Sequence, residues 1–427
     1  MVSSDARVYH RRIVDDELDE LAVGLPAVAL QGAKGVGKTE TARRRADRVV
    51  RFDVDQERAA FAARPFDLVP DGTTLLDEWQ LYPRSWDQVR RAVDAGAPPG
   101  SYLLAGSTAP PGARVHSGAG RIDAIRMRPL SLNERGLEEP AVSLERLMAG
   151  GSPPLDGKTS VGLEEYVDEI FASGFPGIRG LPARLRDTRL DGYVTHTIER
   201  EFVEQGTSVR RPASLATWLR GYAAATATTA SYSRILDAAT AGLPEKPSRD
   251  ATTAYRDVLL RTFVLDPVDA WIPVYNPLKR LAQAPKHMLA DPALATRLLA
   301  LDRTDVITAR DDVRIDGRGG SMLGPLFEHL VVQSVQTYAQ RIGARVGHLR
   351  VQDGRHEVDV IVERGRKVVA LEVKLATTVD DRDVRHLHWL REQLGSDLVD
   401  AAVVTTGQIA YRRPDGIAVV PAALLGP

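Results

Sequence analysis

The feature that most constrains this chain is a glycine-rich octapeptide between an apolar run and a helix-forming segment. It follows Ala27–Leu30 and precedes Glu40–Arg45. Strand, loop and helix is the context in which G-x-x-x-x-G-K-[ST] forms a phosphate-binding loop, because its N–H groups and the helix dipole face an anion. The segment therefore predicts a nucleotide site rather than an ordinary surface loop. The predicted binding residues are Gly32, Ala33, Lys34, Gly35, Val36, Gly37, Lys38 and Thr39.

The predicted nucleotide is ATP with Mg²⁺. Lys38 is expected to reach the β- and γ-phosphates, and the Thr39 hydroxyl is expected to ligate Mg²⁺. A second apolar strand, Thr73–Leu76, ends in Asp77-Glu78, which is typical of a Walker B site. There Asp77 would hold Mg²⁺ directly or through water, and Glu78 would polarise the attacking water as general base. Together these residues predict ATP hydrolysis.

Two further polar positions follow in the same block. The apolar run Tyr102–Gly106 ends in Ser107-Thr108, and either residue fits the polar sensor that a doubly wound ATPase carries beside Walker B. An ordinary turn or helix cap is the alternative. Arg121 lies on a glycine-flanked loop, where it is either an arginine finger for a neighbouring subunit's nucleotide or a solvated arginine. The first reading predicts a homo-oligomer, at least a dimer.

Length and composition set the frame for these motifs. At 427 residues the chain is too long for one core, and we expect domains at 1–150, 151–310 and 311–427. The absence of cysteine excludes disulfides and thiolate chemistry. No apolar run approaches the roughly 20 residues of a membrane span, and no signal peptide is apparent, so we expect a cytoplasmic protein without a membrane partner. The net charge of −1 gives no global reason to expect nucleic acid.

Four segments of the first block resemble one family. Leu75–Pro83, Ala105–Ser107, Gly120-Arg121 and Met127–Glu134 occur in this order, and the last contains Pro-Leu-Ser-Leu-x-Glu. This series resembles the prokaryotic AAA+ ATPases that carry a C-terminal domain of unknown function, the DUF4143 group. The resemblance implies an AAA+ type parallel α/β sheet at the N-terminus.

The middle region, 151–310, is expected to be helical. Segments 229–239 and 250–260 read as two helices, and 262–265 reads as a strand, a series similar to a winged helix. Arg249, Arg256 and Arg261 would then face phosphates, although such helix pairs also serve as packing or oligomer contacts.

A second chemical constellation lies in 311–427. Asp359 stands within the strand His356–Val362, and Glu372 and Lys374 share one face of the strand Val368–Lys374. A hairpin would bring them together, and two carboxylates with a lysine can hold Mg²⁺ and orient water for phosphodiester cleavage.

These residues are similar to the D…ExK core of restriction-endonuclease-like nucleases, with Glu328 matching the helix glutamate and Val358 replacing the usual proline. The resemblance implies an α/β nuclease-like domain with Mg²⁺ or Mn²⁺ at Glu328, Asp359 and Glu372, acting on nucleic acid, DNA more than RNA. The alternative is a non-cleaving domain that makes the chain an ATP-switched regulator of nucleic acid or of a protein partner.

Overall fold

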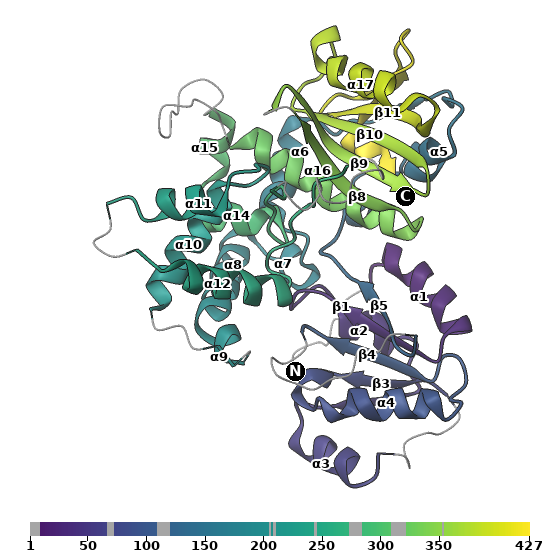
Figure 1. The fold of residues 1–427 in the computed structure, drawn as a ribbon, viewed down its shortest axis with the longest axis vertical. Helices are drawn as coiled ribbons and strands as arrows, with labels where there is room; N and C mark the ends of the chain where they lie inside the picture. The colour runs from purple at the N-terminus through teal and green to yellow at the C-terminus, as the bar shows by residue number, and fades with distance from the viewer. Residues whose placement is uncertain are drawn as a thin grey trace.

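The computed structural model has three parts, which are a parallel sheet, a helical region and a second, larger sheet (Figure 1). No helix in these described parts is long and apolar enough to cross a membrane. The residues described are 9–65, 72–108, 120–204, 206–207, 211–242, 246–272, 284–308, 322–351 and 354–427.

The first sheet is entirely parallel and has the strand order β2-β3-β4-β1-β5. Its three central strands are almost fully buried, which explains why they read as continuous apolar runs in the sequence. The expected N-terminal parallel sheet is therefore confirmed. Its elements are α1 (Ile13–Gly24), β1 (Ala27–Gln31), α2 (Lys38–Arg43), β2 (Arg48–Arg51), α3 (Asp55–Ala63), β3 (Thr74–Asp77), α4 (Arg84–Asp94), β4 (Tyr102–Gly106) and β5 (Asp123–Arg126).

This strand order places the predicted nucleotide motifs side by side. Strand β4 lies between β1 and β3, so Gln31 pairs with Gly106 and Asp77 pairs with Ala105. The carboxyl ends of the three strands therefore meet at one edge, where open α/β sheets bind their ligands.

The middle region is helical, as expected, but a winged helix is not observed in its described residues. Helices α11 and α12 occupy the expected positions, whereas the strand expected over 262–265 is reduced to a one-residue bridge between Leu265 and Leu289. Winged-helix function for this element thus stays a prediction. The elements are α6 (Leu163–Ala172), α7 (Pro176–Arg179), α8 (Ala183–His196), the π-helical turn η3 (Thr197–Glu201), α9 (Phe202–Glu204), α10 (Pro212–Ala224), α11 (Tyr232–Ala239), α12 (Arg249–Arg261), α14 (Pro292–Leu298) and α15 (Arg303–Thr308).

The second sheet has the order β7-β12-β13-β11-β10-β9-β8. Strands β8, β9 and β10 form an antiparallel meander after α16, and α17 then crosses over to β11, which is parallel to β10. The elements are α16 (Leu323–Arg341), β8 (Arg345–Val351), β9 (His356–Arg364), β10 (Lys367–Lys374), α17 (Asp381–Leu394), β11 (Leu398–Thr405), β12 (Ile409–Arg412), β13 (Ala418–Pro421) and β14 (Leu425–Gly426).

Residues 142–158 pair with this C-terminal part rather than with the first sheet. Strand β6 (Val142–Ser143) pairs with β14, and β7 (Gly157–Lys158) is the edge strand beside β12. Between them, α5 (Leu144–Ala149) packs near β10 and β11, as Figure 1 shows. The expected boundary at residue 150 therefore falls inside a segment that completes the C-terminal domain.

The segment after β5 joins all three parts. Glu134, from the Pro-Leu-Ser-Leu-x-Glu element, accepts hydrogen bonds from Arg12 Nε at 2.9 Å and from the Ile13 N–H at 2.8 Å. Arg12 also donates to the Val36 carbonyl of the predicted phosphate loop at 2.8 Å. The Leu130 N–H donates to the Gly174 carbonyl of the helical region, and the Leu132 N–H donates to Ser334 Oγ on α16. This element of the sequence thus links the phosphate loop to the helical region and to α16.

Candidate functional site

The phosphate loop has a backbone that only glycine suits at three positions. Gly35 and Gly37 have φ values of +81° and +104°, where a side chain is strained. A Cβ at Gly32 would lie 2.2 Å from the Met127 carbonyl oxygen, which is too close for any other residue. The loop conformation is therefore built into the sequence.

Lys38 lies at the start of α2 and folds back over this loop. Its Nζ donates to the Gly32 carbonyl at 2.7 Å and to the Ala33 carbonyl at 2.9 Å. Burial lowers the pKa of Lys38 to about 8, against the nearby Glu78, which raises it. A polyphosphate in the loop would give this ammonium a stronger acceptor than two neutral carbonyls.

Thr39 and Asp77 come together as predicted. The Thr39 Oγ1 donates to Asp77 Oδ1 at 2.8 Å, across the junction of α2 and β3. Burial raises the pKa of Asp77, and the Thr39 hydrogen bond opposes that rise. A hydroxyl and a carboxylate are the oxygen ligands that Mg²⁺ takes beside a nucleotide, so these two residues fit the ion. When bound, Mg²⁺ would neutralise phosphate charge here.

Glu78 sits directly after β3 in a strained conformation. Its φ of +51° is in the left-handed region, which is uncommon for a residue other than glycine and concentrates at functional sites. Gln80 Nε2 donates to Glu78 Oε2 and lies 3.4 Å from the Oγ of buried Ser107. Gln80 thereby links the predicted base to the predicted sensor.

Gln80 had no assigned role in the sequence analysis. Its signals there are its position two residues after Glu78 and its place in the resembled segment Leu75–Pro83. The structure adds a packing reason for the adjoining glycine, because a Cβ at Gly106 would lie 2.5 Å from Gln80 Oε1. The Gln80 side chain thus packs against β4, in the space that a side chain at position 106 would otherwise occupy.

Arg121 lies away from the nucleotide loop of its own chain. It precedes β5, whose first residue Asp123 pairs with Val28 near the amino end of β1, whereas the loop follows the carboxyl end of β1. Its Nε lies 2.8 Å from Asp94 Oδ1, and its side chain is about half exposed. The residue therefore lies at the end of β5 opposite to its own phosphate loop, and a role at a neighbouring chain's nucleotide stays a prediction.

Arg126 is a basic residue near the loop that sequence reasoning missed. It ends β5 opposite Gln31, and its guanidinium stacks 3.7 Å from the Phe263 ring centroid. Burial lowers the pKa of Arg126 to about 10, although Asp266, 3.5 Å away, raises it. Its Nη1 is buried without a hydrogen-bond acceptor. The sequence alone does not show that Arg126, at the end of its strand, is buried beside the phosphate loop and against Phe263.

The helical region lies directly over the phosphate loop. Lys34 Nζ, from the loop, is 2.7 Å from Glu204 Oε2 and 3.7 Å from Glu201 Oε1. Burial raises the pKa of Glu201, and the Lys34 ammonium opposes it. Both glutamates belong to η3 and α9, and π-helical turns such as η3 are frequent at functional sites.

The C-terminal constellation also assembles. Glu372 and Lys374 share a face of β10, where Lys374 Nζ is 2.7 Å from Glu372 Oε1. Asp359, on β9, accepts the Val373 N–H at 2.9 Å through Oδ2. Glu328 reaches the same place from α16, since both it and Asp359 contact one lysine. The structure thus brings all four predicted residues together.

That lysine, Lys286, was absent from the predicted site. Its Nζ lies 2.6 Å from Glu328 Oε1 and 3.1 Å from Asp359 Oδ1, and its side chain is 1% exposed. Burial raises the pKa of Glu328 and of Glu372 to about 8, and the Asp359 charge adds to both. Burial also raises the pKa of Asp359, but Lys286 and the Val373 N–H outweigh it and the net pKa is lowered.

The predicted metal ligands therefore meet an ammonium rather than open space. Among the residues that the structure describes, no group of three or more histidine or carboxylate side chains is arranged to hold a metal. Glu328, Asp359 and Glu372 do not fit the predicted Mg²⁺ or Mn²⁺ with Lys286 in this position. Sequence gave no signal for Lys286, because it lies far from the D…ExK residues in the chain.

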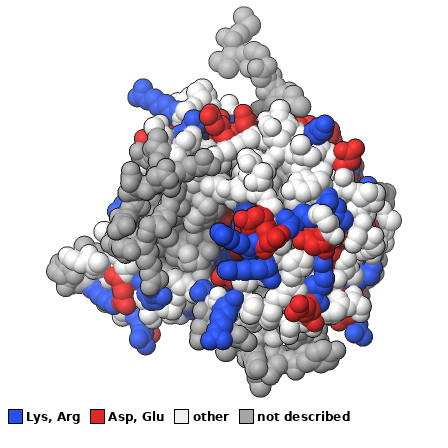
Figure 2. All heavy atoms as spheres, turned by 90° about the horizontal axis from the view of Figure 1, so that it is seen from above, with Lys and Arg blue, Asp and Glu red and all other residues white. Residues whose placement is uncertain are grey.

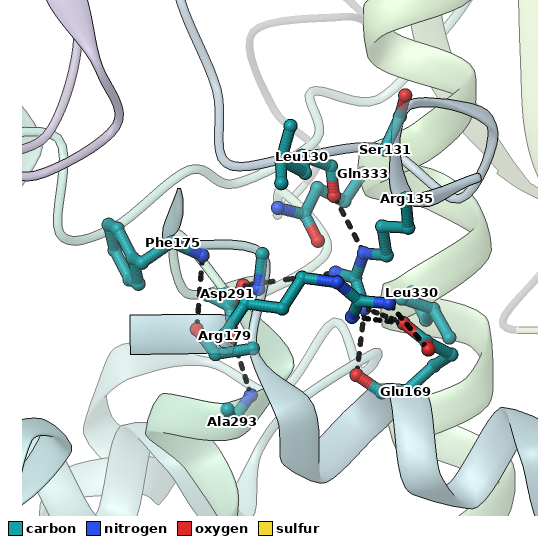
Figure 3. A network of polar contacts seen from close by, with 12 residues as sticks. Leu130, Ser131, Arg135, Glu169, Phe175, Arg179, Asp291, Ala293, Leu330 and Gln333 are labelled. Carbon is teal, nitrogen blue, oxygen red and sulfur yellow. Dashed lines mark hydrogen bonds and ion pairs between the residues drawn. The ribbon is translucent and has the colours of Figure 1, made fainter. Parts of the chain in front are cut away.

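A buried ionic network connects the segment after β5 with the helical region (Figure 3). Arg135 donates from Nη1 to Glu169 Oε2 at 3.0 Å and from Nε to the Leu130 carbonyl at 2.9 Å. Arg179 approaches the same carboxylate at 2.8 Å, and Asp291 accepts the Gly174 N–H at 2.6 Å. Burial raises the pKa of Glu169, but the two guanidiniums outweigh it and the net pKa is lowered. The segment after β5 is thus locked against the helices.

The strand order, the loop and the Thr39–Asp77 pair define a P-loop ATPase domain. Three family models match the chain in succession. An AAA domain matches residues 25–135, a domain of unknown function (DUF8612) matches 163–305, and a second such domain (DUF4143) matches 323–425. The chain therefore carries an AAA-type ATPase domain, the kind that binds and hydrolyses ATP, followed by a DUF4143 domain.

Two mycobacterial proteins are similar to this chain along most of its length. The uncharacterized proteins Rv2008c of Mycobacterium tuberculosis and Mb2031c of Mycobacterium bovis are each 24% identical over 417 residues, covering 93% of this chain and 80% of the relative. A Walker-type ATPase of Pyrococcus abyssi has 15% identity and a TM-score of 0.40, covering 69% of this chain and 97% of that structure.

Proposed function

We propose that this chain is an ATP-hydrolysing switch whose nucleotide state controls a nuclease-like C-terminal domain that holds nucleic acid, DNA in preference to RNA. Lys38, Thr39 and Asp77 bind ATP with Mg²⁺, and Glu78 activates the attacking water. The products of hydrolysis are ADP and phosphate, and the useful output is a change in how the C-terminal domain holds its partner.

The observation that carries this proposal is the direct connection between the nucleotide loop and the other two parts. Lys34 in the loop reaches Glu204 of the helical region, and Arg12 joins the loop carbonyl of Val36 to Glu134. The segment that follows β5 then contacts α16, where Ser334 Oγ accepts the Leu132 N–H at 3.0 Å. A γ-phosphate that pulls on the loop therefore acts on elements that pack against the C-terminal sheet.

The nuclease-like reading is supported by the order of the C-terminal elements and by what they bring together. A helix, an antiparallel meander, a crossover helix and a parallel strand place Glu328, Asp359, Glu372 and Lys374 in one cluster. Fold alone does not establish an activity, so the residues of the cluster decide what the domain does.

The nucleic-acid partner is supported by local features rather than by overall charge. The face that carries α17 mixes Lys and Arg with Asp and Glu (Figure 2). Near it, the His356 and Trp389 rings stack at 4.1 Å, which offers an aromatic platform beside Arg385. Because the charges on this face are mixed in sign, we expect nucleic acid bound there to lose affinity only shallowly as salt rises.

The experiment measures binding of labelled single-stranded DNA, duplex DNA and RNA to the full chain with no nucleotide, with ADP, and with ATP in the Glu78→Gln variant. The proposal expects an affinity for DNA that differs at least about fivefold between the ADP and ATP states, the low end of typical coupling. Equal affinity in all three states would contradict the switch. ATP hydrolysis by a protein that binds none of the three nucleic acids would point to a protein partner instead.

A second candidate function is metal-dependent cleavage of the bound nucleic acid. The convergence of Asp359, Glu372 and Lys374 supports it, whereas the Lys286 ammonium between the carboxylates of Glu328 and Asp359 opposes it. Plasmid, single-stranded DNA and RNA are incubated with the protein and Mg²⁺ or Mn²⁺, with Lys374→Ala as the matched control. Cleavage by the wild type that Lys374→Ala abolishes would establish this activity. Intact substrates under all conditions would leave the binding switch as the function.

A further inference from the structure

Lys286 is the residue of the carboxylate cluster that neither ATP hydrolysis nor the D…ExK resemblance explains. It comes from the segment before α14, outside both strands of the nuclease-like hairpin. It is among the largest fully buried side chains of the described chain, and it reaches two carboxylates from different elements. A charged group is buried this deeply only when its partners compensate for the lost water.

The position of the ammonium is fixed by the backbone on both sides. Lys286 and Val268 exchange both backbone hydrogen bonds, at 2.9 and 2.8 Å. The next residue, His287, donates its N–H to the Thr228 carbonyl at 2.9 Å and accepts the Ala227 N–H at 2.9 Å. The lysine is therefore anchored in the folded chain, and it does not lie on a free surface segment.

The ammonium stands where a cation shared by the carboxylates would have to stand. Its Nζ is within hydrogen-bond distance of Glu328 Oε1 and Asp359 Oδ1, and its charge also acts on Glu372. The other oxygen of Asp359 is already occupied by the Val373 N–H. A metal ion that bound these oxygens at about 2.0–2.6 Å would meet the ammonium at close range and be repelled by it.

We propose that Lys286 is the resident cation of this cluster and takes the place of a divalent metal. The ammonium balances the charge of Asp359 and donates a hydrogen bond to Glu328, keeps the hairpin and α16 together, and excludes Mg²⁺ and Mn²⁺. The C-terminal domain therefore holds its partner without cleaving it. The statement that the domain holds a partner rests on the proposed function, whereas the ion pairs of Lys286 are observed in the structure.

The test is a titration of the full chain with Mn²⁺ in the absence of nucleotide. Binding is measured by calorimetry and by the electron paramagnetic resonance signal of free Mn²⁺. Wild type and Asp359→Asn are expected to take up the same amount of Mn²⁺. Lys286→Met, which keeps the bulk and removes the charge, is expected to gain a site at least about tenfold tighter than any wild-type site, because a full positive charge has been removed from it. A second change, Asp359→Asn, should abolish that gain.

Two matched variants make the result specific to the position. Lys286→Arg keeps a cation there and is expected to gain no Mn²⁺ site. Lys374→Met removes the other lysine of the cluster, which contacts Glu372 alone among the carboxylates, and is also expected to gain none. If Lys374→Met gains the same Mn²⁺ site as Lys286→Met, the loss of any nearby positive charge is enough to create the site. The position of the Lys286 ammonium is then not what excludes the metal, and the proposal is wrong.

The wild-type titration decides the question even where Lys286→Met folds poorly, which circular dichroism detects. A wild-type Mn²⁺ site that Asp359→Asn abolishes would overturn the proposal by itself. Such a site would leave the nucleotide dependence of DNA binding untouched. Conversely, DNA binding that ignores nucleotide would contradict the switch and leave the Mn²⁺ titrations unchanged, so the two failures are distinguishable.

Discussion

Lys34 and Glu204 are 170 residues apart in the sequence, and their side chains form a 2.7 Å ion pair between the phosphate loop and the helical region. Glu201, buried beside them, is 3.7 Å from the same ammonium. Lys34, a residue of the phosphate loop, therefore also belongs to the contact between that loop and the helical region.

Lys34→Met should separate these two parts without removing the nucleotide site. We expect ATP binding to persist, because the loop amides and Lys38 remain, while the nucleotide-induced change in hydrogen exchange over η3 and α9 is lost. Lys246→Met is the matched control, since its exposed pair with Asp237 lies in the same region away from the loop. Unchanged exchange responses in Lys34→Met would exclude a coupling role for this pair.

Lys38→Ala and Glu78→Gln should fail at different steps. Without the Lys38 ammonium the phosphates lose their main cation, so nucleotide binding is expected to disappear in a fluorescent-ATP titration. Glu78→Gln keeps the shape of the site but cannot accept a proton, so ATP should stay bound while kcat falls about 10²–10⁴-fold. An affinity of Lys38→Ala equal to that of the wild type would show that the nucleotide binds elsewhere.

Binding of ATP should take up a proton at alkaline pH. Burial lowers the pKa of Lys38 to about 8 in the free protein, and a bound polyphosphate must raise it. At about pH 8.5 the free lysine is mostly neutral, so binding protonates it, whereas at pH 6.5 it is already charged. Calorimetry in buffers of different ionisation enthalpy measures the uptake. Lys38→Arg, charged throughout this range, should show none from this group.

Arg135→Met should lower stability more than any exposed arginine does. Removing the guanidinium leaves the buried Glu169 with only Arg179, and breaking a buried pair costs about 3–5 kcal/mol. Denaturant unfolding followed by circular dichroism measures the loss. Arg303→Met, whose pairs with Glu164 and Asp168 are exposed, is the control and should unfold with the wild-type midpoint. Equal midpoints for the two variants would show that the network in Figure 3 does not hold the parts together.

Arg121→Ala tests whether hydrolysis needs a neighbouring chain. Arg121 precedes the amino end of β5, whereas its own loop follows the carboxyl end of β1, so the arginine-finger hypothesis requires a homo-oligomer in which it reaches the next subunit's nucleotide. Arg121→Ala and Glu78→Gln should each lose most ATPase activity, and mixing them should restore part of it, because some interfaces combine an intact Arg121 with an intact Glu78. An Arg121→Ala protein with full activity would leave this residue a surface arginine.

Local patterns predicted the nucleotide residues because their chemistry depends on neighbours in the chain. The loop glycines, Lys38, Thr39 and the Asp77-Glu78 pair each follow a strand, and parallel strands bring such ends to one edge. The same reasoning placed Asp359 with Glu372 and Lys374, since a hairpin joins them.

The residues that were missed act across large separations. Gln80 matters because Ser107 lies beside it, Arg126 because Phe263 packs under it, and Lys286 because α16 and β9 bring two carboxylates to it. An isolated lysine or arginine in a sequence does not reveal which distant element will bury it. The domain boundary at 150 failed to separate two domains for the same reason, because β7 finds its partner near residue 410.

The pairing of β6 with β14 has a consequence for how the protein is made. Ser143 donates its hydroxyl hydrogen to the Pro427 carbonyl, 284 residues later, and the adjoining strands pair at Leu425 and Gly426. A ribosome must therefore release nearly three hundred further residues before β6 has a partner. Until then β6 is an unpaired edge, and β7 is one until Ile409 and Ala410 have been made; unpaired edges are prone to associate with other chains. The first sheet can form early, but the C-terminal domain closes only after β14 has been synthesised.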